Sequence, residues 1–257
     1  MTLTKEEQNH LLDCMLDMGE LLLGCGAEIS RVEDTLSRMG RAYGAARMDV
    51  FVITSIISMT MEFPDEEAVT ETRRILSDWP TDFRRLEDLN ALSRRCCAEP
   101  LSPPALRQEL DAIAARGKPL LPVYLGSLLA GGSFAVFFGG SLWDGLAAAL
   151  FALAVCLLQD RLGRTRLNTV ASNLFISLLI GLGVGLLCLA LPALHMDKIL
   201  IGDIMLLIPG LAMTNAIRNM LVGDTISGVV RLAESLMWAA ALAGGFMVAL
   251  LMIQRLS

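Results

Sequence analysis

The stretch NTVASNLFISLLIGLGVGLLCLAL, residues 168–191, contains no charged side chain. A helix of about 20 apolar residues is long enough to cross the hydrocarbon core of a bilayer. The same composition extends on both sides, because residues 119–254 carry only 12 charged side chains in 136 positions, whereas residues 1–118 carry 35. In hydrocarbon each unpaired backbone polar group costs several kcal/mol, so such a segment must form spanning helices. We therefore expect an α-helical integral membrane protein preceded by a small soluble domain.

Five spans fit the apolar part of the chain, each near the length that a bilayer requires. They cover about 119–138, 142–159, 168–191, 199–217 and 235–253. The fifth span has an alternative start near Ile226 instead of Ser235, which requires that the charges of Arg231 and Glu234 be shielded from the hydrocarbon. The predicted transmembrane domain is thus 118–257, with five helices.

Residues 1–117 have the pattern of a mixed α/β domain. Apolar residues at helical spacing predict helices over 5–23, 28–43, 81–97 and 104–116. The β-branched and aromatic run VFVITSIISMTMEF, residues 50–63, predicts one strand. Pro64-Asp65 marks a turn, after which residues 68–75 are expected to return as a second strand.

Charge predicts both the partners and the orientation. Residues 1–117 have a net charge of −8 and residues 118–257 a net charge of +2. An acidic soluble part argues against nucleic acid and against docking on anionic lipid. Basic residues gather on one side of the predicted spans, and that side is cytoplasmic by the positive-inside rule. They are Arg116, Lys118, Arg161, Arg164, Arg166 and Arg218, against Lys198 and Arg255 on the other side. We expect the N-terminal domain in the cytoplasm and the C-terminus outside.

The fourth predicted span is interrupted in its middle by Pro209-Gly210. Proline removes a helix hydrogen bond, and a helix broken inside the bilayer exposes backbone groups and a helix dipole that can bind a polar substrate. At 3.6 residues per turn, four residues fall within about one face of this span: Asp203, Gly210, Thr214 and Arg218. The pattern predicts a polar ladder along a substrate path. A simple proline kink with interfacial charges is the alternative interpretation.

Two members of this ladder have specific predicted roles. Asp203 is the candidate proton carrier, because an acid inside the membrane is costly and is by default a functional hypothesis. Arg218 is the candidate for a substrate carboxylate, since its planar fork matches that group. On the third span, Asn173 belongs to a polar stripe and needs a partner in hydrocarbon. Gly181 and Gly185 on the same span are expected to serve close helix packing.

The loop after the fourth span and the start of the second predicted helix also carry candidate residues. Gly223-Asp224 is predicted to form a turn whose aspartate caps the next helix, and Arg231 and Glu234 can pair on one helix face. These four residues are expected to act in gating or in structure. In the N-terminal domain, Glu28, Arg31 and Glu33 lie at a helix start, where the helix dipole favours acids.

No sequence pattern indicates catalysis. The chain shows no nucleophile–base arrangement, Walker loop or dinucleotide fingerprint, so we expect no enzymatic activity and no cofactor. The cysteines have no metal or redox spacing, and with only His10 and His195 a histidine metal site is not expected. The alternative that remains is a membrane-anchored enzyme or sensor whose site lies in the N-terminal domain.

Four motifs resemble the threonine/serine exporter family: GAEISRVE at 26–33, IPG at 208–210, TNAIR at 214–218 and GD at 223–224. They occur in order over nearly the whole chain. The resemblance places family motif positions on Glu28, Arg31, Glu33, Pro209, Gly210, Thr214, Asn215, Arg218, Gly223 and Asp224. One departure is Asn219, where family members often have an acidic residue.

The resemblance implies a secondary exporter of a small polar metabolite in the bacterial inner membrane. Fused members of the family carry a second block of about five further spans, which this chain of 257 residues lacks. It therefore resembles the larger subunit of the split form, similar to a proposed two-subunit succinate exporter. The implied partner is a separate small membrane subunit with four or five spans. A homo-oligomer is the other assembly that we consider.

Overall fold

The computed structural model describes residues 4–75, 81–117, 119–163 and 167–256. The chain forms two compact units. One unit comprises Met1–Gly117 together with Arg218–Gly228, and the other comprises Lys118–Ile217 together with Val229–Ser257. Three basic residues used above to predict the orientation, Lys118, Arg164 and Arg166, lie outside the described residues.

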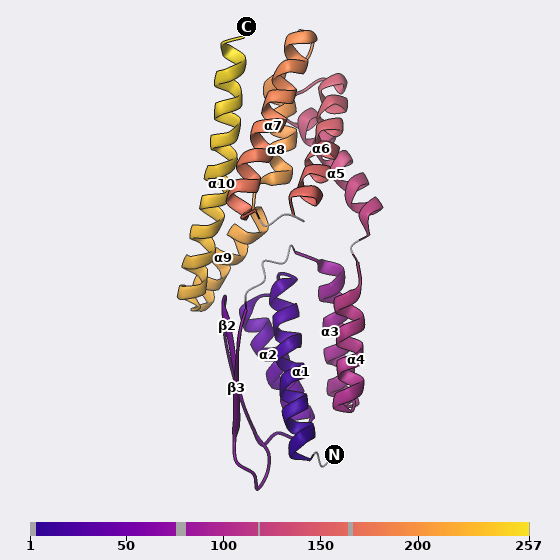
Figure 1. Ribbon diagram of the computed structural model, residues 1–257, viewed down its shortest axis with the longest axis vertical. Coiled ribbons are helices and arrows are strands. Elements are labelled where there is room, and N and C mark those ends of the chain that lie inside the picture. Colours follow the sequence, from indigo (N-terminus) through magenta and orange to yellow (C-terminus); the bar gives the residue numbers. More distant parts are fainter. Residues whose placement is uncertain (1–3, 76–80, 118, 164–166, 257) are drawn as a thin grey trace. The chain divides into compact units, whose positions relative to one another are not determined.

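The first unit begins with two helices, α1 (Lys5–Gly24) and α2 (Ile29–Ala42) (Figure 1). Strands β1 (Arg47–Ile53), β2 (Ile56–Glu62) and β3 (Val69–Arg74) follow, and then helices α3 (Phe83–Ala98) and α4 (Pro103–Ala115). The four helices agree with the predicted ranges to within about two residues. Local signals explain these boundaries. Thr4, for example, forms a capping box with Glu7, in which the Thr4 backbone N–H donates to the Glu7 carboxylate at 2.8 Å.

The prediction of one strand over residues 50–63 is wrong. The segment contains a tight hairpin in which β1 pairs antiparallel with β2, and Ile53 is opposite Ile56. Thr54-Ser55 makes the turn without glycine, proline or asparagine, so the usual turn signal is missing. The β3 strand then pairs antiparallel with β2, giving the strand order β1-β2-β3.

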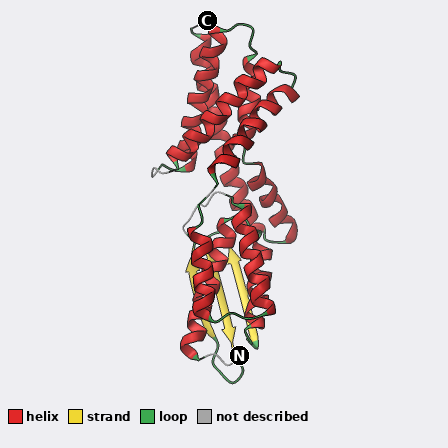
Figure 2. Cartoon of the chain, turned by 90° about the vertical axis from the view of Figure 1, so that its right-hand side faces the viewer, coloured by secondary structure: helices red, strands yellow, loops and turns green. Residues whose placement is uncertain are grey.

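The core of this unit lies between the helices and one face of the sheet (Figure 2). Alternate residues of β2 point into it because side chains of a strand alternate between faces. These are Ile57, Met59 and Met61, all buried. They meet a row of fully buried side chains on α1: Leu11, Leu12, Met15 and Met18.

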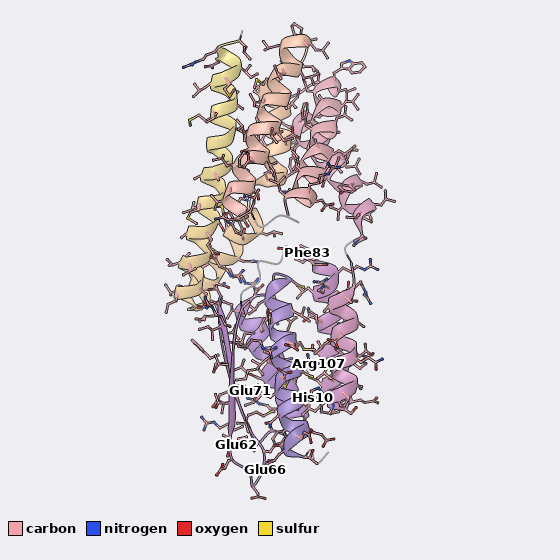
Figure 3. All side chains as sticks on the ribbon, in the orientation of Figure 1. His10, Glu62, Glu66, Glu71, Phe83 and Arg107 are labelled. Carbon is pink, nitrogen blue, oxygen red and sulfur yellow. The ribbon has the colours of Figure 1, made fainter. Side chains whose placement is uncertain are left out.

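A closed ring of two carboxylates and two guanidinium groups also joins the elements of the first unit. Asp13 and Asp17 lie one turn apart on α1, and each is paired with Arg73 of β3 and with Arg107 of α4. The Arg107 Nη2 atom lies 2.6 Å from Asp13 Oδ2 (Arg107 is labelled in Figure 3). Charges balance within the ring, so it joins α1, β3 and α4 without leaving an unpaired ion.

The second unit contains the apolar helices. They are α5 (Leu120–Phe137), α6 (Leu142–Leu162), α7 (Thr169–Ala190), α8 (Met196–Leu207), α9 (Gly210–Val222) and α10 (Thr225–Gln254), of which the last two also contribute to the first unit. By length and composition, α5, α6, α7 and α10 can each cross a membrane. The α8–α9 pair passes the same test as one span bent by 50°, which gives up to five spans in the described part of the chain.

The helix bounds bear on two details of the predicted spans. The fourth span is broken at Ile208–Pro209, as the sequence predicts. The last helix starts at Thr225, close to the alternative start near Ile226, and it runs without interruption past Arg231 and Glu234.

Small residues bring the membrane helices into close contact. A Cβ atom built on Gly202 of α8 would lie 2.5 Å from the Gly131 carbonyl oxygen of α5. On α7, a Cβ atom at Gly181 would lie 2.6 Å from Ala249 Cβ of α10, and one at Gly185 would clash with Ile253. The packing role predicted for Gly181 and Gly185 is therefore confirmed.

We expect Gly202→Ala to lower the thermal stability of the protein. The added methyl group meets backbone and not a flexible side chain, and overpacking of this kind typically costs about 1–3 kcal/mol. The measurement is the loss of the monodisperse protein in detergent after stepwise heating. Gly126→Ala on α5 is the control, because nothing lies within 4 Å of its built Cβ. Equal melting of the two variants would contradict this packing.

Candidate functional site

The break between α8 and α9 is made by Pro209 and the residue before it. Ile208 has an extended backbone, with φ −62° and ψ 128°, as expected before proline. The backbone hydrogen bonds of the helix resume in α9, where the Met213 N–H donates to the Pro209 carbonyl at 3.0 Å. The Thr214 hydroxyl donates to the Gly210 carbonyl at 2.9 Å, so this hydroxyl is used locally.

Asp203 lies on α8, five residues before the break. Its side chain is fully buried, and among the described residues neither carboxylate oxygen has a hydrogen-bond partner. The neighbouring Gly202 packs against Gly131, Ala135 and Ala148, which offer no side-chain donor. A buried acid without a partner is costly and requires an explanation, and proton exchange is one.

The predicted polar ladder does not form one straight face. The 50° bend separates Asp203 on α8 from Thr214 and Arg218 on α9. Asp203 also belongs to the second unit, whereas Arg218 begins the segment that belongs to the first. An ideal helical wheel assumes a single axis, and the proline removes that axis.

Arg218 is paired with Glu28, a contact that the sequence reasoning missed. The Arg218 Nη1 atom lies 2.5 Å from Glu28 Oε1, and the side chains are 54% and 23% exposed, respectively. Glu28 occupies the position before the first turn of α2 but makes no capping hydrogen bond with its side chain. Both residues lie in the motifs noted above, yet they are 190 residues apart, so no local pattern indicates that they meet.

Glu33, five residues further along the chain on α2, contacts β1 and is affected by the charge of Asp224. Its Oε1 atom accepts the Val52 N–H of the edge strand β1 at 3.0 Å. Burial raises the pKa of Glu33, the Val52 hydrogen bond opposes this, and the negative charge of Asp224 raises the pKa further. Glu33 and Asp224 are therefore close enough for their charges to interact.

The turn at Gly223-Asp224 is confirmed, as is the capping role of the aspartate. Gly223 has a φ of 102°, which favours glycine, and Asp224 Oδ1 accepts the Ser227 N–H at 3.4 Å. The Asp224 backbone N–H donates to the Asn219 carbonyl at 2.9 Å, which holds the turn against the end of α9. The second oxygen, Oδ2, and the Ser227 hydroxyl are buried and have no partner in the described parts of the chain.

The remaining predicted residues are scattered. Arg31 is exposed, and Asn215 is half-buried. Asn173 is half-buried on α7, where its backbone carbonyl accepts the Ser177 hydroxyl at 2.8 Å. Within the described residues Arg231 and Glu234 do not form the predicted pair: Glu234 is exposed and the buried Arg231 Nε has no partner.

A further polar contact, Asp144 with His195, was also missed. Asp144 at the start of α6 is fully buried, and its carboxylate accepts the Ser141 N–H at 2.7 Å and the His195 N–H at 2.7 Å. The imidazole Nδ1 of His195 lies 3.0 Å from Asp144 Oδ2. Ser141 and Asp144 form a capping box that the sequence could have revealed, but the bond to His195 joins distant segments.

Comparison with known proteins identifies relatives of this chain. The family model described as "Putative threonine/serine exporter" matches residues 13–253. A "Probable threonine/serine exporter" of Mycobacterium tuberculosis is 24% identical over 248 residues, which are 93% of this chain and 46% of that protein. The chain thus spans about half the length of this relative. A "Probable succinate transporter subunit YjjP" of Klebsiella aerogenes is 27% identical over 259 residues, 98% of this chain and 97% of that protein.

No solved structure matches the chain. The family match, in contrast, runs through both compact units and includes every motif position from Glu28 to Asp224. The chain therefore belongs to the threonine/serine exporter family.

Proposed function

We propose that this protein is a subunit of a secondary exporter that moves a small polar metabolite across the bacterial inner membrane. The names of its relatives suggest two classes of substrate. One class is the amino acids threonine and serine, and the other is a dicarboxylate such as succinate. The observation that carries the proposal is the broken α8–α9 span with the buried, unpaired Asp203. A helix that only anchored a domain would need neither a break in its hydrogen bonds nor an acid within it.

In the proposed mechanism Asp203 exchanges the proton that drives export. The break at Pro209 and Gly210 supplies flexible backbone on the substrate path, which Thr214, Asn215 and Asn173 help to line. Arg218 receives a carboxylate of the substrate. Gly223, Asp224, Arg231 and Glu234 lie where α10 begins and contribute to gating or to structure.

The proposed partner is a small membrane subunit of the same family with four or five spans. The word "subunit" in the name of the Klebsiella relative supports this, because that protein aligns over almost its whole length. The test is reconstitution in liposomes, with and without a candidate small membrane subunit of the same family. We expect efflux of labelled threonine or succinate from the pair and little from the single chain. Full transport by the single chain would favour a homo-oligomer. Substrate binding without transport, both by the single chain and by the pair, would favour the alternative of a membrane-anchored sensor.

Orientation gives a second prediction. A reporter inserted at Gly163, which ends α6, is expected to report the cytoplasm, and a reporter fused after the last residue is expected to report the exterior. The reason is the excess of arginine between α6 and α7, together with five spans. A cytoplasmic signal from both fusions, each shown to be full-length by immunoblot, would contradict this topology and place an even number of spans in the membrane.

A further inference from the structure

Negative charge is in excess where α2 faces the segment Arg218–Gly228. Glu28, Glu33 and Asp224 bring three carboxyl groups to this part of the first unit, and Arg218 is the cation paired there among the described residues. Arg31, on the same helix, is exposed and forms no ion pair in the described ranges. The neighbouring charge that acts on Glu33 is the like charge of Asp224, and neither acid forms an ion pair within the described parts of the chain.

Hydrogen bonding is incomplete at the same place. Asp224 Oδ2 and the Ser227 hydroxyl are buried without a partner within the described part of the chain, and Ser227 is only 1% exposed. A buried polar group without a partner costs roughly 1–3 kcal/mol, so each such group in a native protein calls for an explanation. A bound cation that donates hydrogen bonds would satisfy both atoms and balance both acids.

The guanidinium group of Arg218 supplies the complementary charge. Glu28 engages it through one nitrogen, and the side chain remains about half exposed. An arginine has five N–H donors in a planar fork, which can bind a carboxylate through two parallel hydrogen bonds. A substrate carboxylate can therefore replace Glu28 at Arg218 with a better match of geometry.

We propose that this cluster is a binding site for a zwitterionic α-amino acid. Glu33, Asp224 and Ser227 offer three acceptors to the three donors of the ammonium group, and Arg218 takes the carboxylate. The inference rests on the proposed export function and selects the amino acid over the dicarboxylate as its substrate. A dicarboxylate would bring a second negative group against Glu33 and Asp224, where like charges repel.

The first test measures binding to the purified full-length protein in nanodiscs by isothermal titration calorimetry. L-Threonine is compared with 3-hydroxybutyrate, which lacks the amino group, with threoninol, which lacks the carboxylate, and with succinate. We expect each of the three to bind at least about tenfold more weakly than threonine, because each leaves one charged subsite unpaired. Threonine affinity should be the same in sodium chloride and in choline chloride. Equal binding of 3-hydroxybutyrate or succinate, or displacement of threonine by sodium ions, would overturn the proposal.

The second test uses variants that keep shape and remove charge. Glu33→Gln and Asp224→Asn are each expected to weaken threonine binding at least about tenfold while changing the weak binding of 3-hydroxybutyrate little. Asp34→Asn is the matched control, because Asp34 lies beside Glu33 on α2 but forms an exposed pair with Arg38 at 2.9 Å. Threonine binding that survives both cluster variants would overturn the proposal. The comparison of the four ligands on the wild-type protein remains a test of the proposal even if a variant does not fold.

The two proposals fail in different ways. Export of succinate that is insensitive to Glu33→Gln would overturn the amino-acid site and leave the exporter intact. Absence of transport by the assembled pair would overturn the exporter, whereas the calorimetric ranking of the four ligands would still decide the amino-acid site.

Discussion

Transport by an Asp203→Asn variant is expected to lose its response to pH. Export driven by a proton gradient should fall by at least about tenfold, which corresponds to about 1.4 kcal/mol in the barrier. The amide has nearly the same shape as the carboxyl group but cannot release or accept a proton in this range. The measurement is efflux from proteoliposomes over a series of internal and external pH values, alongside substrate binding, which should be largely retained.

Asp197→Asn is the control for this prediction. Asp197 lies on the same helix, α8, but is exposed and pairs with Lys198 at 3.2 Å. It should leave both the rate and its pH response unchanged. If Asp203→Asn retains the wild-type flux and pH response, the buried acid is structural, and the substrate path must be sought elsewhere, with Asn173 and α7 next in line.

Replacing Arg218 by lysine is expected to weaken transport strongly although the charge is kept. Lysine is a point charge without the planar fork, so it loses one of two charge-assisted hydrogen bonds to a substrate carboxylate. Such a bond contributes about 1.5–3 kcal/mol, so the apparent KM should rise by roughly 10- to 100-fold. Labelled-substrate efflux at several substrate concentrations measures this, with the amount of inserted protein checked on a gel.

Two further variants distinguish binding of a carboxylate by the planar fork of Arg218 from the effect of its positive charge alone. Arg38→Lys changes another arginine that is paired with an acid, at the exposed Arg38–Asp34 pair of α2, and should have no effect on transport. Arg218→Gln should reduce transport further than Arg218→Lys. Wild-type flux in Arg218→Lys would mean that this residue is only a positive anchor at the membrane surface, for which lysine serves equally well.

The helices could be predicted closely because their signals are local. Hydropathy over about 20 residues defined α5, α6 and α7 to within a few residues, and Pro209 marked the break in the fourth span. The hairpin of β1 and β2 was missed because Thr54-Ser55 turns the chain without a characteristic turn residue. The β-branched and aromatic residues on both sides of this turn therefore have the sequence pattern of one long strand.

The contacts of the candidate site could be predicted less well because they join distant residues. The sequence singled out Arg218 and Asp203 as candidate charged groups, but the helical wheel placed them on one axis. The structure instead pairs Arg218 with Glu28 and leaves Asp203 alone in the described residues. Similarly, the bond of Asp144 to His195 depends on which helices become neighbours. A single sequence records the side chains and not these pairings.

The membership of Arg218–Gly228 in the first compact unit has a consequence for biosynthesis. The ribosome finishes residues 1–117 first, but the last part of this unit follows only after residues 118–217 have been made. At about 5–20 residues per second, this delay is roughly 5–20 s. Until then Glu28 lacks its partner Arg218. The unit is therefore completed only in nascent chains whose first four predicted spans have already been translated, so the pairing of Glu28 with Arg218 cannot precede the synthesis of those spans.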